Sequence, residues 1–363
     1  MNFQELLRFA VEHDASDVHI QASAAPMLRI AGQIRSVESQ PLTNEQALDF
    51  IASIAPESDQ TDLKAAIIEG LDFSHAVPGL SRFRCSAYSH LGHVGIVMRV
   101  IRTEIPPFDK LNLPKAVRDI ALVRRGLTLV TGTTGSGKST TLAAMIDLIN
   151  STLRTKIITI EDPIEYVHPC KKALVSQLEV GSDTPSFARA LRQALRQDPD
   201  VVLVGELRDV ETLRIALQAA DTGHQVFSTV HSANAPQTIE RIIAMFPPVE
   251  HKLLLTQLAG SIEAIISQRL VRAQDGSRRP AVEILRGTAV TEKYILENRV
   301  SDLAEYIQAG ESGMQSFDQH LLKMYRADLV SGTEALRWAS NPEALSMTMR
   351  GILRPGTRSS ETE

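Results

Sequence analysis

The sequence predicts an α/β protein whose central domain contains a parallel sheet, with a small α+β domain before it and a helical region after it. From Gly126 onward, short apolar runs alternate with stretches of helical periodicity, a spacing typical of parallel α/β sheets. The first hundred residues instead mix short strand-like runs with helices, and the strand signal fades after about residue 285. A chain of 363 residues also exceeds the size of most single cores, which indicates more than one domain.

The amino-terminal α+β domain is expected over residues 1–104. Apolar residues at positions 3, 6, 7, 10 and 11 share one helical face, and a second helical stretch lies near Asn44–Ile54. Strand-like runs occur at Asp17–Gln21, Met27–Ile30, Arg82–Tyr88 and Val94–Ile101. The proline-rich start of the segment 105–118 predicts a stiff linker to the next domain.

The central domain is expected over residues 119–285. Its predicted strands are Leu127–Val130, Lys156–Ile160, Val201–Val204 and Gln225–Val230. These runs are almost continuously apolar, as strands covered on both faces are. Helical periodicity around 187–195, 213–220 and 317–325 predicts helices there, and the last of these belongs to a helical region over 286–353. Residues 354–363 are expected to form a disordered tail.

Composition excludes several classes of protein. A net charge of −5 and an aromatic content of 4% argue against a nucleic-acid partner. The two cysteines cannot form a four-thiolate site, so we expect no zinc, and they predict a reduced protein of the cytoplasm. No apolar stretch approaches the length of a membrane span, and acidic residues stand where a signal peptide would be basic and then apolar.

A phosphate-binding loop is predicted at residues 132–139, which match G-x-x-x-x-G-K-[ST] in full between a strand-like run and a helical pattern. Its glycines let backbone N–H groups converge on phosphate oxygens, and the helix amino terminus adds partial positive charge. Lys138 would bridge the β- and γ-phosphates of ATP, and the Ser139 hydroxyl would hold Mg²⁺. The predicted nucleotide-binding residues are Gly132, Thr133, Thr134, Gly135, Ser136, Gly137, Lys138, Ser139 and Thr140.

Polar residues follow three predicted strands at the end where open α/β sheets bind ligands. Glu206 follows an apolar run and has the sequence position of a Walker B acid that acts on Mg²⁺ or its waters. Glu165 is the candidate general base, although an exposed acidic turn would also explain the segment 161–165. His231 could hydrogen-bond the γ-phosphate or could be a satisfied histidine at a strand end. His224 could equally cap a helix end, lie at an interface or take part in catalysis.

Arginines supplied across an interface often complete the charge of a phosphoryl-transfer site. The first domain offers Arg82, Arg84 and Arg99 on two strand-like runs, with Arg82 and Arg84 on one face of the same strand. A solvated or ion-paired basic face would account for them equally well.

Four sequence blocks occur in a fixed order along the chain. They are GTTGSGKST at 132–140, TIEDPIEY at 159–166, QDPDVVLVGELRD at 197–209 and TGHQVFSTVHS at 222–232. Together they resemble the secretion ATPase superfamily. Within it the chain is similar to the type IV pilus retraction ATPases, the PilT/PilU-like group. ASDVHI at 15–20, RFR at 82–84, FPP at 246–248 and GMQSFDQ at 313–319 extend the resemblance over nearly the whole chain.

The resemblance implies a PAS-like amino-terminal domain, a RecA-like P-loop ATPase domain and a homohexameric ring. It implies an ATP-hydrolysing motor in the cytoplasm, peripheral at the inner membrane, that turns the platform protein of the pilus machine. The expected outcome of that motion is pilus retraction and twitching motility.

The resemblance also assigns roles to residues. Glu165 falls in the acidic box as the catalytic glutamate, Glu206 in Walker B, and His224 and His231 in the histidine box. The arginines that match those supplied to the nucleotide by the family's first domain are Arg82, Arg84 and Arg99.

Two positions depart from the family pattern. Residues 291–300 read TEKYILENRV where retraction proteins commonly carry an A-I-R-N-L-I-R-E-like segment, and Ala31 stands where an acidic residue usually precedes the glycine. An accessory, PilU-like motor that depends on a paralogous pilus ATPase is therefore an alternative, as is a subunit that binds nucleotide without hydrolysing it. A RecA-like ring that translocates nucleic acid is a further alternative.

Overall fold

The computed structural model describes residues 2–57, 59–101 and 104–351, and the chain divides into two compact units. The first unit comprises Met1–Ile105 together with two short segments, Asp162–Val167 and Glu179–Pro185. The second comprises Pro106–Glu161, His168–Leu178 and the chain from Ser186 onward. The expected tail at 354–363 lies outside the described residues.

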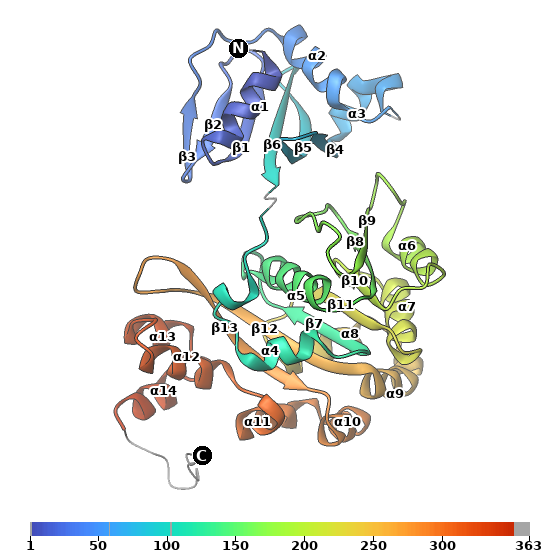
Figure 1. Cartoon of the computed structure of the whole chain (residues 1–363), viewed down its shortest axis with the longest axis vertical. Helices are drawn as coiled ribbons and strands as arrows, with labels where there is room; N and C mark the ends of the chain where they lie inside the picture. Colours follow the sequence, from blue (N-terminus) through green and yellow to red (C-terminus); the bar gives the residue numbers. More distant parts are fainter. Residues whose placement is uncertain (1, 58, 102–103, 352–363) are drawn as a thin grey trace. The chain divides into compact units, whose positions relative to one another are not determined.

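A six-stranded antiparallel sheet of order β3-β2-β1-β6-β5-β4 forms the first unit (Figure 1). Its strands are β1 Ala15–Gln21, β2 Met27–Ile30, β3 Gln33–Ser36, β4 Leu71–Val77, β5 Ser81–His90 and β6 His93–Ile101. Its helices are α1 Phe3–Glu12, α2 Asn44–Ile54 and α3 Leu63–Glu69. The predicted elements of this α+β domain are confirmed, whereas its PAS-like character remains a prediction.

The three helices cover one face of this sheet because alternate strand residues are apolar. Phe83, Cys85 and Ala87 of β5 are fully buried in the core that the helices close. Helix α1 begins with a capping box, in which Asn2 and Glu5 each accept a hydrogen bond from the other's backbone N–H. The residues between the apolar ones, including Arg82 and Arg84, lie on the opposite face.

A seven-stranded sheet of order β13-β12-β7-β11-β10-β8-β9 forms the centre of the second unit. Its strands are β7 Gly126–Thr131, β8 Lys156–Glu161, β9 Leu174–Glu179, β10 Val201–Val204, β11 Gln225–Val230, β12 Ile262–Arg272 and β13 Arg278–Arg286. The run β12-β7-β11-β10-β8 is parallel, and β13 pairs antiparallel with β12. The four predicted strands, β7, β8, β10 and β11, are therefore confirmed as neighbours in a parallel sheet.

Helices cover both faces of the parallel strands. They are α4 Lys115–Ala121, α5 Lys138–Thr152, α6 Phe187–Ala194, α7 Val210–Asp221, α8 Ala235–Ala244 and α9 His251–Ser261. Helices α4 and α5 pack on one face against residues such as Val130 and Phe227. The alternate residues Leu129, Ile158 and Val202 are also fully buried, which is why these strands read as continuous apolar runs.

Five helices confirm the predicted helical region after residue 286. They are α10 Ala289–Leu296, α11 Leu303–Ala309, α12 Phe317–Arg326, α13 Gly332–Trp338 and α14 Pro342–Met349. Helices α12, α13 and α14 cluster beside β12 and β13 (Figure 1). Their core contains Phe317, Leu321 and Met324 of α12, which lie on the face that the periodicity at 317–325 makes apolar. In the described part of the chain, no helix combines the length and apolar character needed to cross a bilayer.

The segment predicted as a linker, residues 105–118, has a different structure. The second unit begins at Pro106, and α4 begins at Lys115 with Val117 fully buried. Phe108 and Leu113 pack on the same core as α5. Burial of these apolar side chains holds the segment against the second unit, an effect that its three prolines conceal in the sequence.

Acid should destabilise the second unit through His320, whose pKa is lowered to about 4 by burial. The unfolded histidine titrates near pH 6.5, so the unfolded chain binds the proton first as the pH falls from about 6.5 to 4. The free energy of unfolding should therefore fall through that window and be fully retained above it. The His320 side chain accepts a hydrogen bond from the Val282 N–H at 3.0 Å, which His320→Gln can replace with an amide oxygen.

Unfolding followed by fluorescence of Trp338, the only tryptophan in the chain, measures this effect. The loss of stability between about pH 7.5 and pH 5 should be smaller in His320→Gln than in the wild type by about 2 kcal/mol. The other buried histidines serve as the internal control, because they are present in both proteins. An equal pH dependence in the two proteins would show that His320 does not carry this linkage.

Candidate functional site

The parallel register brings the ends of three strands to one edge of the sheet. Val204 of β10 pairs with Ser228 of β11, and Val230 of β11 pairs with Thr131 of β7. The residues that follow these strands therefore emerge side by side. The predicted phosphate loop, Glu206 and His231 come together at this edge in the second unit.

The phosphate loop requires glycine where the chain turns from β7 into α5. A Cβ atom on Gly132, whose φ is +146°, would lie 2.5 Å from Ser136 Oγ and 2.6 Å from the backbone oxygen of Gln268. Gly137 caps α5 in the left-handed conformation, with φ of +91°. Ser136 is 3% exposed and its Oγ has no hydrogen-bond partner among the described residues. The loop thus presents a buried hydroxyl and a helix amino terminus without a side-chain cap, which fit a phosphate group.

Lys138 is the first residue of α5 and is 8% exposed. Its Nζ donates to the backbone oxygens of Gly132 and Thr133, both at 3.0 Å. The ammonium group therefore lies against the phosphate loop, at the position from which such a lysine binds phosphate oxygens. Ser139 and Thr140 follow it in the first turn of the same helix.

Glu206 is the second residue after β10, and 14% of its side chain is exposed. Its Oε1 forms an ion pair with Nε of Arg208, and its Oε2 lies 3.5 Å from Nε2 of His231. The turn that carries Glu206 is fixed to β11, because Thr229 Oγ1 donates to the Gly205 oxygen at 2.7 Å. The carboxylate is thus held at the sheet edge in contact with two other functional groups.

His231 follows β11, and its pKa lies below the ordinary value. Burial is the main cause, and the positive charges of Lys138, Arg241 and Arg208 add to it, while Glu206 acts in the opposite direction. A neutral imidazole can donate or accept a hydrogen bond at neutral pH without adding charge. The histidine therefore suits contact with a phosphate group better as a hydrogen-bonding group than as a cation.

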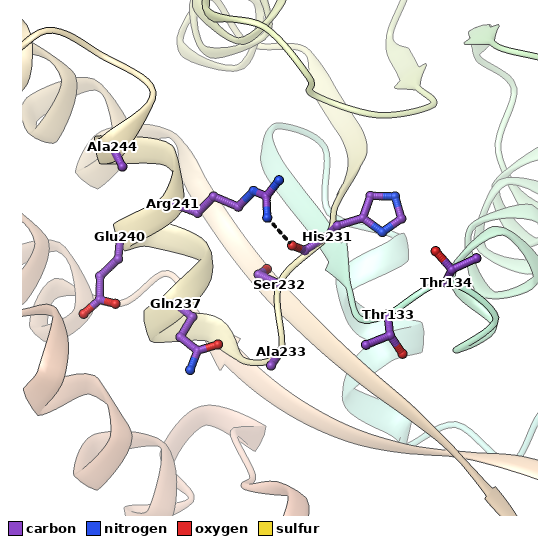
Figure 2. A pocket seen from close by; sticks show the side chains of 9 residues that line it. All are labelled: Thr133, Thr134, His231, Ser232, Ala233, Gln237, Glu240, Arg241 and Ala244. Atoms are coloured by element: carbon purple, nitrogen blue, oxygen red, sulfur yellow. Dashed lines mark hydrogen bonds between the residues drawn. The ribbon is translucent and has the colours of Figure 1, made fainter.

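An open pocket of about 770 Å³ lies between the phosphate loop and α8. Figure 2 shows the His231 ring directed toward Thr133 and Thr134 of the phosphate loop. The Arg241 side chain extends from α8 toward His231. Arg241 Nη1 donates to the backbone oxygen of His231 at 2.8 Å, which fixes the chain that carries the imidazole (Figure 2). The remaining lining residues are Ser232, Ala233, Gln237, Glu240 and Ala244.

The residues present fit Mg²⁺ bound together with a nucleotide. The buried Ser136 hydroxyl without a partner and the glycine turn form a cradle for phosphate, beside Ser139 and Glu206. Among the described residues, no three histidine, cysteine, aspartate or glutamate side chains gather to hold a metal ion. Mg²⁺ ordinarily takes one or two protein oxygens and completes its shell with phosphate and water. Ser139 and Glu206 are the side chains that would bind Mg²⁺.

His224 does not join this cluster within the chain. It precedes β11, at the opposite end of the strand from His231, roughly 20 Å away at the rise of a β-strand. Its Nδ1 lies 3.0 Å from the Ala219 oxygen and 3.2 Å from Thr222 Oγ1, at the carboxyl end of α7. The geometry therefore favours the capping alternative for His224 over contact with the phosphate loop of the same chain.

The other predicted site residues belong to the first unit. Glu165 is exposed in the segment Asp162–Val167, where the Asp162–Pro163 peptide bond is cis. Arg82 and Arg84 share a face of β5 as expected, and Arg84 pairs in register with Arg99 of β6. Because these residues and the phosphate loop lie in different units, their action on the nucleotide remains a prediction.

Two of the three arginines are engaged within the first unit. Arg82 Nη2 donates to Glu179 Oε2 at 2.7 Å, and Arg99 Nε donates to Asp17 Oδ1 at 2.9 Å. Burial acts to raise the pKa of Asp17, but hydrogen bonds from Ser16 and Arg99 outweigh it and hold this pKa below the ordinary value. The ion-paired basic face that the sequence left open is thus present.

Sequence reasoning missed Arg208 and Arg241 as members of the site. Arg208 follows Glu206 by two residues in the run GELRD, and Arg241 is a basic residue on the helix after His231. Their short distances along the sequence suggest that they lie near Glu206 and His231. The ion pair of Arg208 with Glu206 depends on the turn after β10, and the hydrogen bond of Arg241 to the His231 backbone oxygen depends on the placement of α8.

Comparison with known proteins confirms the resemblance drawn from the sequence. The family model for type II/IV secretion system proteins matches residues 2–327. The type IV pilus retraction ATPase PilT of Pseudomonas aeruginosa is 42% identical over 344 residues, which cover 94% of this chain and 99% of that protein. The type IV pilus ATPase PilU of the same species is 38% identical over 352 residues, covering 96% of this chain and 92% of PilU.

A solved structure agrees with this relationship. The crystal structure of the pilus retraction motor PilT with bound ADP superposes with a TM-score of 0.87 at 40% identity, covering 94% of this chain and 98% of that one. The chain therefore belongs to the family of type II/IV secretion system proteins, in its group of PilT/PilU-like pilus ATPases.

Proposed function

We propose that this chain is an ATP-hydrolysing motor that powers the retraction of type IV pili and thereby twitching motility. The observation that carries the proposal is the phosphate loop with Glu206 and His231 at the same sheet edge. The match to the retraction ATPase of Pseudomonas aeruginosa over 94% of the chain supports the choice of pilus retraction.

The residues of the second unit divide the work of phosphoryl transfer. The loop N–H groups and Lys138 bind the phosphates of ATP, while Ser139 and Glu206 hold Mg²⁺, directly or through water. Bound Mg²⁺ supplies positive charge that offsets charge developing on the β- and γ-phosphates. His231 contacts the γ-phosphate as a neutral donor, and Arg241 keeps its backbone in place.

Glu165 acts as general base in this proposal, accepting a proton from the attacking water. Its neighbours in the first unit, Arg82, Arg84 and Arg99, are the arginines that the family resemblance assigns to the nucleotide. His224 would act from an interface between subunits, since it lies away from the phosphate loop of its own chain.

The working assembly in this proposal is a homohexamer in the cytoplasm, peripheral at the inner membrane, where it turns the platform protein of the pilus machine. An accessory role beside a paralogous pilus ATPase is the second candidate. It is favoured by 38% identity to PilU over 96% of the chain and by the sequence TEKYILENRV at α10.

Replacing Lys138 by alanine should abolish ATP turnover, because the ammonium group that lies over the phosphate loop is lost. We expect a fall of at least about 10³-fold in the steady-state rate of phosphate release from purified protein. Lys171→Ala is the matched control, since it removes an ammonium group that pairs with Asp147 on the surface. Normal turnover in Lys138→Ala would remove the site assignment.

Glu206→Gln should trap the motor with ATP bound, because the amide keeps the shape of the side chain but not the charge that serves Mg²⁺. In the native host, we expect long surface pili to accumulate without shortening, as counted by imaging beside the wild type. Loss of pili would instead indicate an extension motor. Pili unchanged in number and dynamics would indicate the accessory role.

Arg99→Ala should lower turnover by about 10-fold or more while ATP binding changes little, if the arginine acts across a subunit boundary. Mixing this variant with Lys138→Ala protein should then restore part of the activity, because each mixed ring contains some complete sites. ATPase rates of the mixture and of each variant alone measure the effect. No restoration in rings shown to contain both variants would argue against action between subunits.

A further inference from the structure

A buried carboxylate lies outside the phosphate-loop cluster, at the end of β9. Glu179 is the last residue of β9 and is 2% exposed. It belongs to the first compact unit, together with Arg82 of β5 and the loop Asp162–Val167 that carries Glu165. A charge that is this deeply buried must be matched by specific partners.

One oxygen of Glu179 receives two donors from different parts of the first unit. Arg82 Nη2 donates to Oε2 at 2.7 Å, and the backbone N–H of Ile164 donates to the same atom at 3.0 Å. Ile164 is itself buried and directly precedes the exposed Glu165. Through this one oxygen atom, the Glu179 carboxylate connects the loop Asp162–Val167, here called the acidic loop, to Arg82 of β5.

The backbone of Glu179 is fixed as well. Its N–H donates to Asp183 Oδ2 at 2.8 Å, and its carbonyl oxygen accepts from the N–H of Asp183 at 2.8 Å. Only 23% of the Arg82 side chain is exposed, so the guanidinium is held against the carboxylate rather than extended into water. The position of Ile164 is thus defined by groups that have little freedom to move.

We propose that Glu179 is a positioning residue, which holds the acidic loop so that Glu165 keeps a productive orientation. In this arrangement Arg82 is the counter-charge of Glu179. The inference rests on the proposed function, because it takes Glu165 to be the general base. Small displacements of a catalytic group greatly lower the rate of reaction. Loss of the contact between Glu179 and Ile164 therefore lowers the rate of the chemical step more than it weakens ATP binding.

Two substitutions separate the contacts of Glu179. Glu179→Gln keeps an oxygen for the Ile164 N–H but removes the charge opposite Arg82, whereas Glu179→Ala removes both. Hydrogen exchange of the Ile164 amide in the full-length protein should be about 10-fold faster or more in Glu179→Ala and near the wild-type rate in Glu179→Gln. Unchanged exchange in a folded Glu179→Ala protein would overturn the proposal.

Steady-state kinetics then test the consequence for catalysis. Glu179→Ala should lower kcat by about 10-fold or more with KM for ATP within about 2-fold, and Glu179→Gln should lie between it and the wild type. The control is Asp275→Asn, which breaks an exposed ion pair with Arg279 and should leave kcat unchanged. A loss confined to KM would overturn the proposal.

A double variant distinguishes failure of this inference from failure of the proposed function. In a Glu165→Gln protein, adding Glu179→Ala should cause no further loss in single-turnover rate, because Glu179 acts through Glu165. A further loss as large as in the wild type would overturn the positioning role. Normal turnover in Glu165→Gln alone would instead refute Glu165 as general base, while exchange at Ile164 would still decide whether Glu179 holds the loop.

Discussion

The parallel register of β8, β10, β11 and β7 is the constraint on which the candidate site depends. Glu206, His231 and the phosphate loop are far apart in the sequence, and they meet only because the strands before them end at the same edge. These strands are buried on both faces, so a shift of one residue would exchange the faces of every apolar side chain packed against helices. Packing of α4 to α9 thus indirectly fixes the distance between Glu206 and His231.

Charges at this edge are compensated within the chain before any nucleotide binds. Lys138 donates to two carbonyl oxygens of its own loop, and Glu206 forms an ion pair with Arg208. In the proposed function, ATP and Mg²⁺ would replace these contacts with stronger ones, since phosphate and metal charges exceed those of a carbonyl dipole or an exposed guanidinium. The protein therefore avoids unpaired buried charge in the free state.

Sequence patterns predict those elements whose structure is determined by residues close together in the chain. Continuous apolar runs identify β7, β8, β10 and β11, and glycine spacing identifies the loop. The sequence does not predict β12 and β13, because Arg269 and Glu283 interrupt their apolar runs. Glu283 is nevertheless buried, and the half-buried Arg269 places its guanidinium 3.8 Å from the centre of the Phe317 ring. The family resemblance places His224 and His231 in one histidine box, whereas β11 places them at opposite ends of a strand.

The arginines of the first unit show that side-chain partners far apart in the chain cannot be predicted from sequence alternation. Alternation placed Arg82 and Arg84 on one face, but it could not identify partners that lie far away in the sequence. Arg82 meets Glu179, and Arg99 meets Asp17. No ion pair or hydrogen bond engages Arg84 within residues 2–57, 59–101 and 104–351, although it lies opposite Arg99 in the sheet. Two like charges at neighbouring positions repel, and Asp17 offsets this by binding one of them. In the proposed role of this face at the nucleotide, Arg84 is therefore the arginine that would act without first breaking an ion pair.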